Sequence, residues 1–111
     1  MCSIFSKFNP DLIIYSSNSS SSVIGTLEEA VRRRVDLESA DLTHLDLSGA
    51  KLQAAQLDYV DFIGSDLTDV DLSGASLIGA NLSDCNLSNT NLKGANVIDA
   101  VLDNTHGIWN V

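Results

Sequence analysis

The sequence is poor in the residues from which small domains usually build a core. Among its 111 residues are three Phe, two Tyr and one Trp, and Pro10 is the only proline. Aromatic side chains dominate the energetics of most protein cores because each buries a large apolar surface. A core with so few of them has to be assembled from many smaller side chains. The length leaves room for a single domain.

Long apolar runs and a cysteine framework are missing as well. No segment approaches the about 20 consecutive apolar residues that a membrane-spanning helix needs. The opening MCSIFSKF is too short and too polar for a secretory signal. The two cysteines, Cys2 and Cys85, suit a reducing compartment. These absences predict a cytoplasmic protein that has no membrane segment.

Recognisable catalytic and metal-binding patterns are also lacking. His44 and His106 have no Cys or His at the spacing of a metal site. Residues 69–74 (DVDLSG) match the opening of a calcium loop, but Ala80 stands where the bidentate glutamate should be. The many serines have no histidine partner at an interpretable position. We therefore expect no enzymatic activity, no cofactor and no metal.

The sequence does have a leucine at every fifth residue, as in residues 72–87, LSGASLIGANLSDCNL. Five steps along an α-helix turn about 500°, and an odd number of steps along a strand changes the face. Neither element can gather these leucines on one side. A chain that turns a corner once in every five residues can point all of them at one central axis.

The period runs without a gap through fourteen units, from Val35 to Asn104. The residue two places before each centre is small or apolar, which predicts a second inward position. Five glycines lie two places after a centre, where a corner would favour their backbone freedom: Gly49, Gly64, Gly74, Gly79 and Gly94. The central residues are Leu37, Leu42, Leu47, Leu52, Leu57, Phe62, Leu67, Leu72, Leu77, Leu82, Leu87, Leu92, Val97 and Leu102.

The units ADLTH, ASLIG and ANLSD, with GANV, resemble the A(D/N)LXX motif of pentapeptide-repeat proteins. The resemblance covers about two thirds of the chain. It implies an all-β solenoid, a right-handed quadrilateral parallel β-helix in which four units form one coil of twenty residues. Fourteen units then give about 3.5 coils. With that coil length, Leu45, Ser65 and Cys85 are predicted to form one inward column, and Val70 and Thr90 another.

Residues outside the repeats are expected to close the two ends. We predict an N-terminal extension over residues 1–25, with a strand over 11–15 and a flexible serine-rich tether over 16–22. A short capping helix is expected over 26–34, because Thr26 and Glu29 fit a capping box. The repeats fill residues 35–104, and residues 105–111 are predicted to be a C-terminal cap or contact segment.

Acidic residues are concentrated in the first half of the repeats. Residues 36–71 contain nine Asp and Glu against Lys51 alone. A twenty-residue coil would stack some of them, and like charges at close range raise carboxylate pKa values. We therefore expect mild acid to stabilise the fold. The candidate acidic surface comprises Asp41, Asp46, Asp58, Asp61, Asp66, Asp69 and Asp71.

These features favour a non-catalytic protein-interaction or scaffold module of a bacterium, with an unidentified protein partner and no direct binding to nucleic acid. The resemblance also suggests an alternative. Fluoroquinolone-resistance members of the family are acidic dimers that resemble a DNA duplex and occupy DNA gyrase. This chain offers only about half of their coils. In a third interpretation the outward aspartates merely solvate the rod.

Apolar residues near the C-terminus predict a contact surface that could support a homodimer. Residues 106–111 (HGIWNV) hold the only tryptophan. The alternative is that this tryptophan folds back as a lid over the last coil. The candidate interface comprises Ile78, Ile98, Val101, Ile108, Trp109 and Val111.

Overall fold

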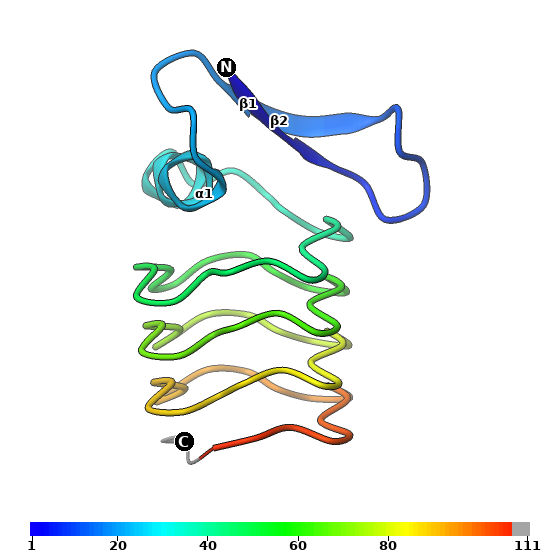
Figure 1. Ribbon diagram of the computed structural model, residues 1–111, viewed down its shortest axis with the longest axis vertical. Coiled ribbons are helices and arrows are strands. Elements are labelled where there is room, and N and C mark those ends of the chain that lie inside the picture. Colours follow the sequence, from blue (N-terminus) through cyan, green and yellow to red (C-terminus); the bar gives the residue numbers. More distant parts are fainter. Residues whose placement is uncertain (108–111) are drawn as a thin grey trace.

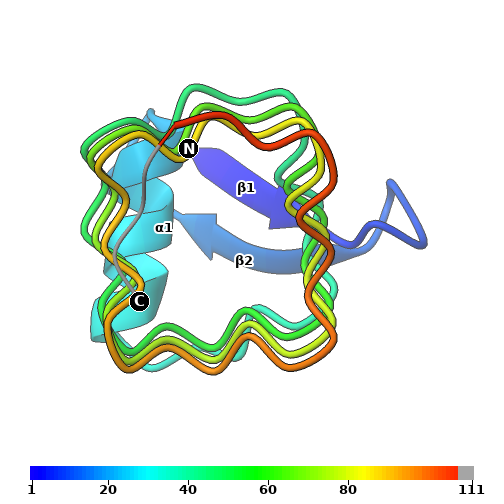
Figure 2. The same cartoon turned by 90° about the horizontal axis from the view of Figure 1, so that it is seen from below.

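The repeats form a four-sided β-helix whose coils stack along one axis. In the computed structural model, which describes residues 1–107, the chain traces a square when viewed along this axis (Figure 2). Each side is joined to the next coil by parallel bridges between residues twenty apart. The bridges run from Asp36 with Gln56 to Asn86 with His106. The predicted solenoid class and twenty-residue coil are confirmed.

The same three backbone hydrogen bonds recur between successive coils. On one side, Leu42 N–H donates to Asp61 O over 2.8 Å, and His44 N–H donates to Ile63 O over 2.9 Å. In the opposite direction, Asp61 N–H donates to Ala40 O over 3.0 Å. Only one residue per unit lies in a bridge, because the next corner begins at once. Continuous strands therefore do not develop within the repeats.

Each corner places one residue in the left-handed region of backbone space. A turn bond closes it, such as the bond of 3.0 Å from Ala80 N–H to Leu77 O. The residue two places after each centre has φ between 55° (His44) and 76° (Gly49). This is the position that the glycine pattern predicted. Nine corners carry another residue instead of glycine: Ser39, His44, Ala54, Tyr59, Asp69, Asp84, Asn89, Asp99 and Asn104.

Two of the corner glycines differ in how closely other atoms surround them, and this difference can be tested by substitution. A Cβ at Gly79 would lie 2.5 Å from a ring carbon of Tyr59, whereas a Cβ at Gly74 meets nothing within 4 Å. Both Gly→Ala changes should cost about 1 kcal/mol, because φ is positive at both sites. Gly79→Ala should cost more, because the Tyr59 ring has to move. Denaturant unfolding of both variants, with and without Tyr59→Ala, measures this difference. Equal costs in the native background would contradict the steric argument.

The core is a stack of leucines with small residues between them. The centres from Leu37 to Leu92 are buried. Three polar inward side chains bond to carbonyls 23 residues earlier, in the preceding coil: Ser65 to Leu42 O over 2.5 Å, Cys85 to Phe62 O over 3.0 Å and Thr90 to Leu67 O over 2.8 Å. Within residues 1–107, no buried side-chain nitrogen or oxygen lacks a hydrogen-bond partner.

The predicted inward columns are present. Ser65 and Cys85 are fully buried, as are Val70 and Thr90. Leu45 is only partly buried, unlike its neighbours Ala40 and Ala50 at the same position of the first coil. Its N–H donates to Ser65 Oγ over 3.0 Å, which links the first two members of the column directly.

A hairpin and a helix lie on the N-terminal end of the stack (Figure 1). Strands β1 (Cys2–Phe5) and β2 (Ile13–Ser17) pair antiparallel, and helix α1 spans Val23–Arg32. The hairpin pairs with the first coil where Asp41 N–H donates to Phe5 O over 2.8 Å. On another side, Glu28 Oε2 accepts the N–H of Lys51 over 2.8 Å. Both N–H donors belong to the first coil, so there is no preceding coil whose carbonyl groups could accept their hydrogen bonds.

The N-terminal boundaries differ from those expected. The helix starts at Val23 rather than in the predicted range 26–34, and Ser22 is its N-cap, accepting Gly25 N–H over 3.0 Å. Thr26 is buried inside the helix and donates to Ser22 O. The expected strand over 11–15 lies at Ile13–Ser17, and β1 was not predicted.

The serine-rich segment is not a free tether. Ser17 is fully buried, and its hydroxyl oxygen accepts the N–H of Ser19 over 3.2 Å and that of Ser20 over 2.9 Å. Ser19 in turn donates to Glu29 Oε1 over 2.6 Å. Serine hydroxyls that bond to nearby backbone and side-chain groups hold the turn between β2 and α1 in one shape.

Glu29 joins the hairpin to the helix and should make the cap sensitive to acid. Its carboxylate accepts hydrogen bonds from the hydroxyls of Ser19 and Tyr15, which lower its pKa from 4.5 to about 2. A folded-state pKa below the unfolded value contributes stability above about pH 4.5 that is lost as the pH falls towards 2. Melting temperatures between pH 2 and 6 should therefore fall with acid, and Glu29→Gln should remove part of this dependence. An unchanged pH profile in that variant would contradict the assignment.

Candidate functional site

The predicted acidic residues lie on the first two coils. Asp41 bridges to Asp61 and Asp46 to Asp66, on two consecutive sides of the square, and Lys51 bridges to Asp71 on the third. In the next coil the same columns continue with uncharged residues, namely Asn81, Asn86 and Asn91. Asp58 and Asp69 complete the predicted set at or beside corners, and Asp58 accepts the Ser76 hydroxyl. The negative charge is therefore next to the N-terminal cap.

The aspartates at the bridge positions are held in place by local hydrogen bonds. Asp46 Oδ1 accepts the N–H of Ser48 over 3.0 Å and its hydroxyl over 2.6 Å. Asn86 Oδ1 accepts the same two bonds from Ser88, over 3.0 and 2.7 Å. Aspartate and asparagine thus perform the same structural task, because either side-chain oxygen can accept the N–H two residues ahead. The fold does not require the negative charge.

Hydrogen bonding, not repulsion, sets the pKa of two of these carboxyls. The Ser48 hydroxyl lowers the pKa of Asp46, and the Ser73 hydroxyl lowers that of Asp71. The expectation that stacking raises the pKa of these aspartates is wrong for Asp46. Because the folded-state pKa is lowered, both groups lose stabilising interactions as the pH falls, so mild acid is not expected to stabilise the fold through them.

The predicted interface residues are only partly covered by the described structure. Ile78 and Ile98 occupy the same corner of neighbouring coils, where Gly79 N–H donates to Ile98 O over 2.9 Å. Ile98 is 61% exposed and Val101 is 37% exposed. Ile108, Trp109 and Val111 lie outside the described residues, so the contact surface that they were predicted to form stays a prediction.

Among residues 1–107 the fold does not bring a set of metal ligands together. No group of three His, Cys, Asp or Glu in this part of the chain could hold a metal ion. Burial raises the pKa of the Cys85 thiol to about 11, so it is not a nucleophile at neutral pH. No helix in the described range is long and apolar enough to cross a membrane.

The sequence did not predict a groove at the junction of α1 and the first coils. Arg32, Arg34 and Lys51 line it together with Glu28. The only signal in the sequence was the run Arg32 to Arg34, which also fits the favourable position of cations at a helix C-terminus.

One solved structure shares this fold, and two others are similar to the chain in sequence over part of their length. A pentapeptide repeat protein from the thylakoid lumen of Arabidopsis thaliana is 24% identical, with a TM-score of 0.54 over 79% of this chain and 57% of that one. Rfr23 of the cyanobacterium Cyanothece 51142 is 28% identical over 67% of this chain and 60% of that one (TM-score 0.32). HetL of Nostoc sp. strain PCC 7120, involved in heterocyst differentiation regulation, is 30% identical over 60% and 38% (TM-score 0.22).

This chain thus spans less than two thirds of the length of each of these proteins. A search among curated proteins found no match. The family model for Pentapeptide repeats matches residues 33–69 and 65–106, with eight copies. The chain belongs to the pentapeptide-repeat family.

Proposed function

We propose that this protein is a non-catalytic interaction module whose acidic face binds a basic surface of a protein partner. The observation that carries the proposal is the equivalence of aspartate and asparagine in the columns. Asn81 and Asn86 occupy the bridge position as well as Asp61 and Asp66 do. A charge that the fold does not need, repeated on two consecutive sides, is available for recognition.

The acidic face, defined as Asp41, Asp46, Asp61 and Asp66, presents its charges at a fixed spacing. Bridged residues of neighbouring coils lie roughly 4.8 Å apart, which is well within the screening length of about 8 Å at physiological salt. The carboxylates therefore act together as one negative field, which speeds encounter with a basic partner. Each is oriented by its own backbone bond, so little side-chain freedom is lost on binding.

DNA mimicry is the alternative, with DNA gyrase or another DNA-binding protein as the partner. A charge at every 4.8 Å or so along the rod is comparable with the one phosphate per 3.4 Å of helix axis that each strand of DNA presents. The bridge columns are only two aspartates deep, however, since Asn81 and Asn86 follow. A supercoiling assay addresses this alternative directly. Inhibition of gyrase by the native protein at low micromolar concentration would favour mimicry.

The test is a variant in which Asp41, Asp46, Asp61 and Asp66 are all changed to Asn. Because asparagine already serves at Asn81 and Asn86, the variant should fold normally. Its control changes Asp84, Asp99 and Asp103 to Asn, which removes three charges outside the acidic face, against four in the variant. Pull-down from a bacterial lysate at two salt concentrations should show a basic partner that the native chain and the control retain and the variant loses. Equal capture by all three proteins would contradict the proposal.

We also propose that two copies can pair through the C-terminal end, where Val97 and Leu102 are less buried than the corresponding leucines of earlier coils. Sedimentation at two concentrations, for the native chain and for Trp109→Ala, tests this. A native chain that stays monomeric throughout would remove the dimer.

A further inference from the structure

Exposed apolar side chains from distant parts of the sequence lie along one edge of the rod. The turn between β1 and β2, residues 6–12, projects beyond the square of coils (Figure 2) and carries Phe8, which is 77% exposed. Tyr59 in the second coil is 47% exposed, and Ile98 in the fourth coil is exposed as well. These residues are far apart in the sequence, so only the fold can bring them to the same edge.

A series of backbone hydrogen bonds joins the turn to this edge, coil by coil. The bonds are Lys7 N–H to Ser39 O over 2.8 Å, Ser39 N–H to Asp58 O over 3.0 Å, Tyr59 N–H to Ile78 O over 2.8 Å and Gly79 N–H to Ile98 O over 2.9 Å. Each bond connects one coil with the next, and the first connects the turn with the first coil. The turn and the four coils therefore form one continuous edge.

The outward position that follows each centre changes in character along this edge. It is occupied by Glu38 and Asp58 in the first two coils, and by Ile78 and Ile98 in the next two. Asp58 Oδ1 accepts the N–H of Ile78 over 3.0 Å, so the acidic half and the apolar half are in direct contact. The ring of Tyr59 reaches the corner of the third coil beside them. We call these five residues the edge surface.

The fold does not require isoleucine at this outward position. Other units have a hydroxyl residue there, such as Ser88, whose N–H and hydroxyl both donate to Asn86 Oδ1. Ile98 keeps only the backbone bond, from its N–H to Asn96 Oδ1 over 3.1 Å. Its side chain gives up the hydroxyl bond and remains exposed. A contiguous exposed apolar surface of this kind is typical of an interaction site.

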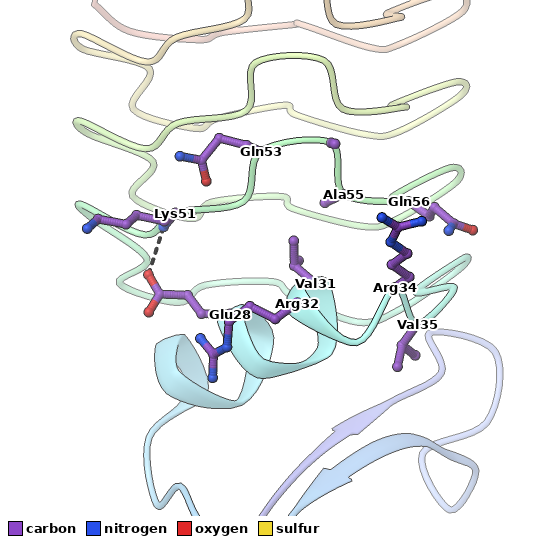
Figure 3. Close-up of a pocket in the computed structure, with 10 residues that line it drawn as sticks. Glu28, Val31, Arg32, Arg34, Val35, Lys51, Gln53, Ala55 and Gln56 are labelled. Atoms are coloured by element: carbon purple, nitrogen blue, oxygen red, sulfur yellow. Dashed lines mark hydrogen bonds between the residues drawn. The ribbon is translucent and has the colours of Figure 1, made fainter.

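The edge carries negative charge and very little positive charge. The segments that form it on the four coils are residues 36–40, 56–60, 76–80 and 96–100, which contain Asp36, Glu38, Asp58 and Asp99 but no Lys or Arg. In the turn, Lys7 is balanced by Asp11. Arg34 stands beside Gln56 in Figure 3, at the corner where this side of the second coil begins, whereas Tyr59 lies at the corner where it ends. Edge-to-edge pairing of two copies would therefore bring like charges together, which is unfavourable.

We propose that the edge surface is the docking site for a basic, amphipathic segment of a protein partner. The apolar face of the segment lies against Tyr59, Ile78 and Ile98, and its Lys or Arg side chains pair with Glu38 and Asp58. With about 4.8 Å between coils, the column from residue 38 to residue 98 spans about 14 Å, which a helix of about ten residues covers. A longer segment also reaches Phe8 on the projecting turn. The edge surface and the acidic face occupy different sides of the square, so this inference goes beyond the proposed function and does not depend on it.

The experiment titrates the full ¹⁵N-labelled chain with a synthetic helical peptide. The peptide has about fourteen residues of Leu, Ala and Lys, with all Leu on one face. Amide shifts at Tyr59, Ile78, Gly79 and Ile98 should saturate. A scrambled peptide of the same composition keeps the charge but has no apolar face, so it should bind about tenfold or more weakly. A peptide with Glu in place of Lys should not bind.

Two double variants test the apolar and the acidic half separately. Ile78→Ser with Ile98→Ser should fold normally, because serine serves at the same position of other units, and should bind the peptide about tenfold or more weakly. Glu38→Gln with Asp58→Asn should also weaken binding by about tenfold, and asparagine keeps an oxygen that can accept the N–H of residue 78.

The matched control for the acidic half is Asp46→Asn with Asp66→Asn. It removes the same charge from the opposite side of the square, beyond the screening length of about 8 Å, so affinity should be nearly unchanged. An equal loss in both charge variants would overturn the proposal, because it would indicate attraction by net charge alone. So would equal affinity for the ordered and the scrambled peptide.

Sedimentation and vesicle binding test the other possible occupants. If the native chain self-associates, and Ile78→Ser with Ile98→Ser abolishes this, the edge surface is an interface between copies and the proposal is overturned. Binding to phosphatidylcholine vesicles that the same variant abolishes would assign the edge surface to a lipid surface and overturn the proposal too. A native chain that remains monomeric, leaves vesicles unbound and binds the ordered peptide supports it.

Discussion

Replacing Cys85 with aspartate is expected to lower the free energy of unfolding by more than about 2 kcal/mol, because a carboxylate would enter a dry interior without a charged partner. Cys85 is fully buried, and its thiol donates to Phe62 O. The carbonyl oxygen offers nothing to a carboxylate, since both groups are acceptors. Denaturant unfolding followed by circular dichroism measures the loss.

Cys85→Ser is the matched control. Ser65 occupies the same column one coil earlier and donates its hydroxyl to Leu42 O, so a serine at position 85 should preserve the equivalent bond to Phe62 O. Its cost should stay near 1 kcal/mol or below. If the aspartate variant were as stable as the serine variant, residue 85 would not face the interior.

Phe62→Ala should produce a second large loss, of about 3–5 kcal/mol. Phe62 is the largest fully buried side chain among residues 1–107, and by the twenty-residue register it lies between the centres Leu42 and Leu82. Each coil contacts only its neighbours, so the cavity left by Phe62 would weaken the packing between the capped first coil and the coils that follow it. Thermal unfolding should then lose cooperativity as well as shift to lower temperature.

The control for this change is Phe62→Leu. Leucine is the residue at the equivalent centres Leu42 and Leu82, so it should fill most of the space and cost much less than alanine does. Equal destabilisation by alanine and leucine would mean that the stack depends on the aromatic ring itself and not on filled volume.

The repeats could be predicted from the sequence because one local rule generates them. The centres, the small inward residues and the corner glycines each follow the same five-residue period. A unit that departs from the pattern at one of these positions can still be recognised from the other two. With the coil length that the family resemblance implies, a register of twenty residues predicts that Asp41 lies beside Asp61 and Asp46 beside Asp66. The parallel bridges between these pairs confirm that register.

The N-terminal cap followed no such rule. Thr26 and Glu29 have the spacing of a capping box, yet Ser22 caps the helix and Glu29 bonds to Tyr15 and Ser19. Several serines in the same segment could have served as the cap, and tertiary contacts with the hairpin decided among them. Local pattern alone could not resolve that competition.

The groove could not be predicted for a related reason. It brings residues 28–35 next to residues 51–56, and this proximity depends on the direction in which α1 crosses the first coil. The sequence shows that Arg32, Arg33 and Arg34 are adjacent, but not that Arg33 is absent from the groove lining while its two neighbours contribute to it. A favourable interaction with the helix dipole would apply to all three arginines alike, so it does not reveal that asymmetry.

The uniform twenty-residue register also has a kinetic consequence. Every bridge from Asp36 to His106 closes a loop of the same length, so each added coil carries a similar entropic cost. No contact between coils has to wait for a distant part of the chain. Folding should therefore nucleate where an end is already closed, at the hairpin and α1, and advance coil by coil toward the C-terminus. Hydrogen exchange should run in the opposite order, with amides of the last coil exchanging first and those of the capped first coil last.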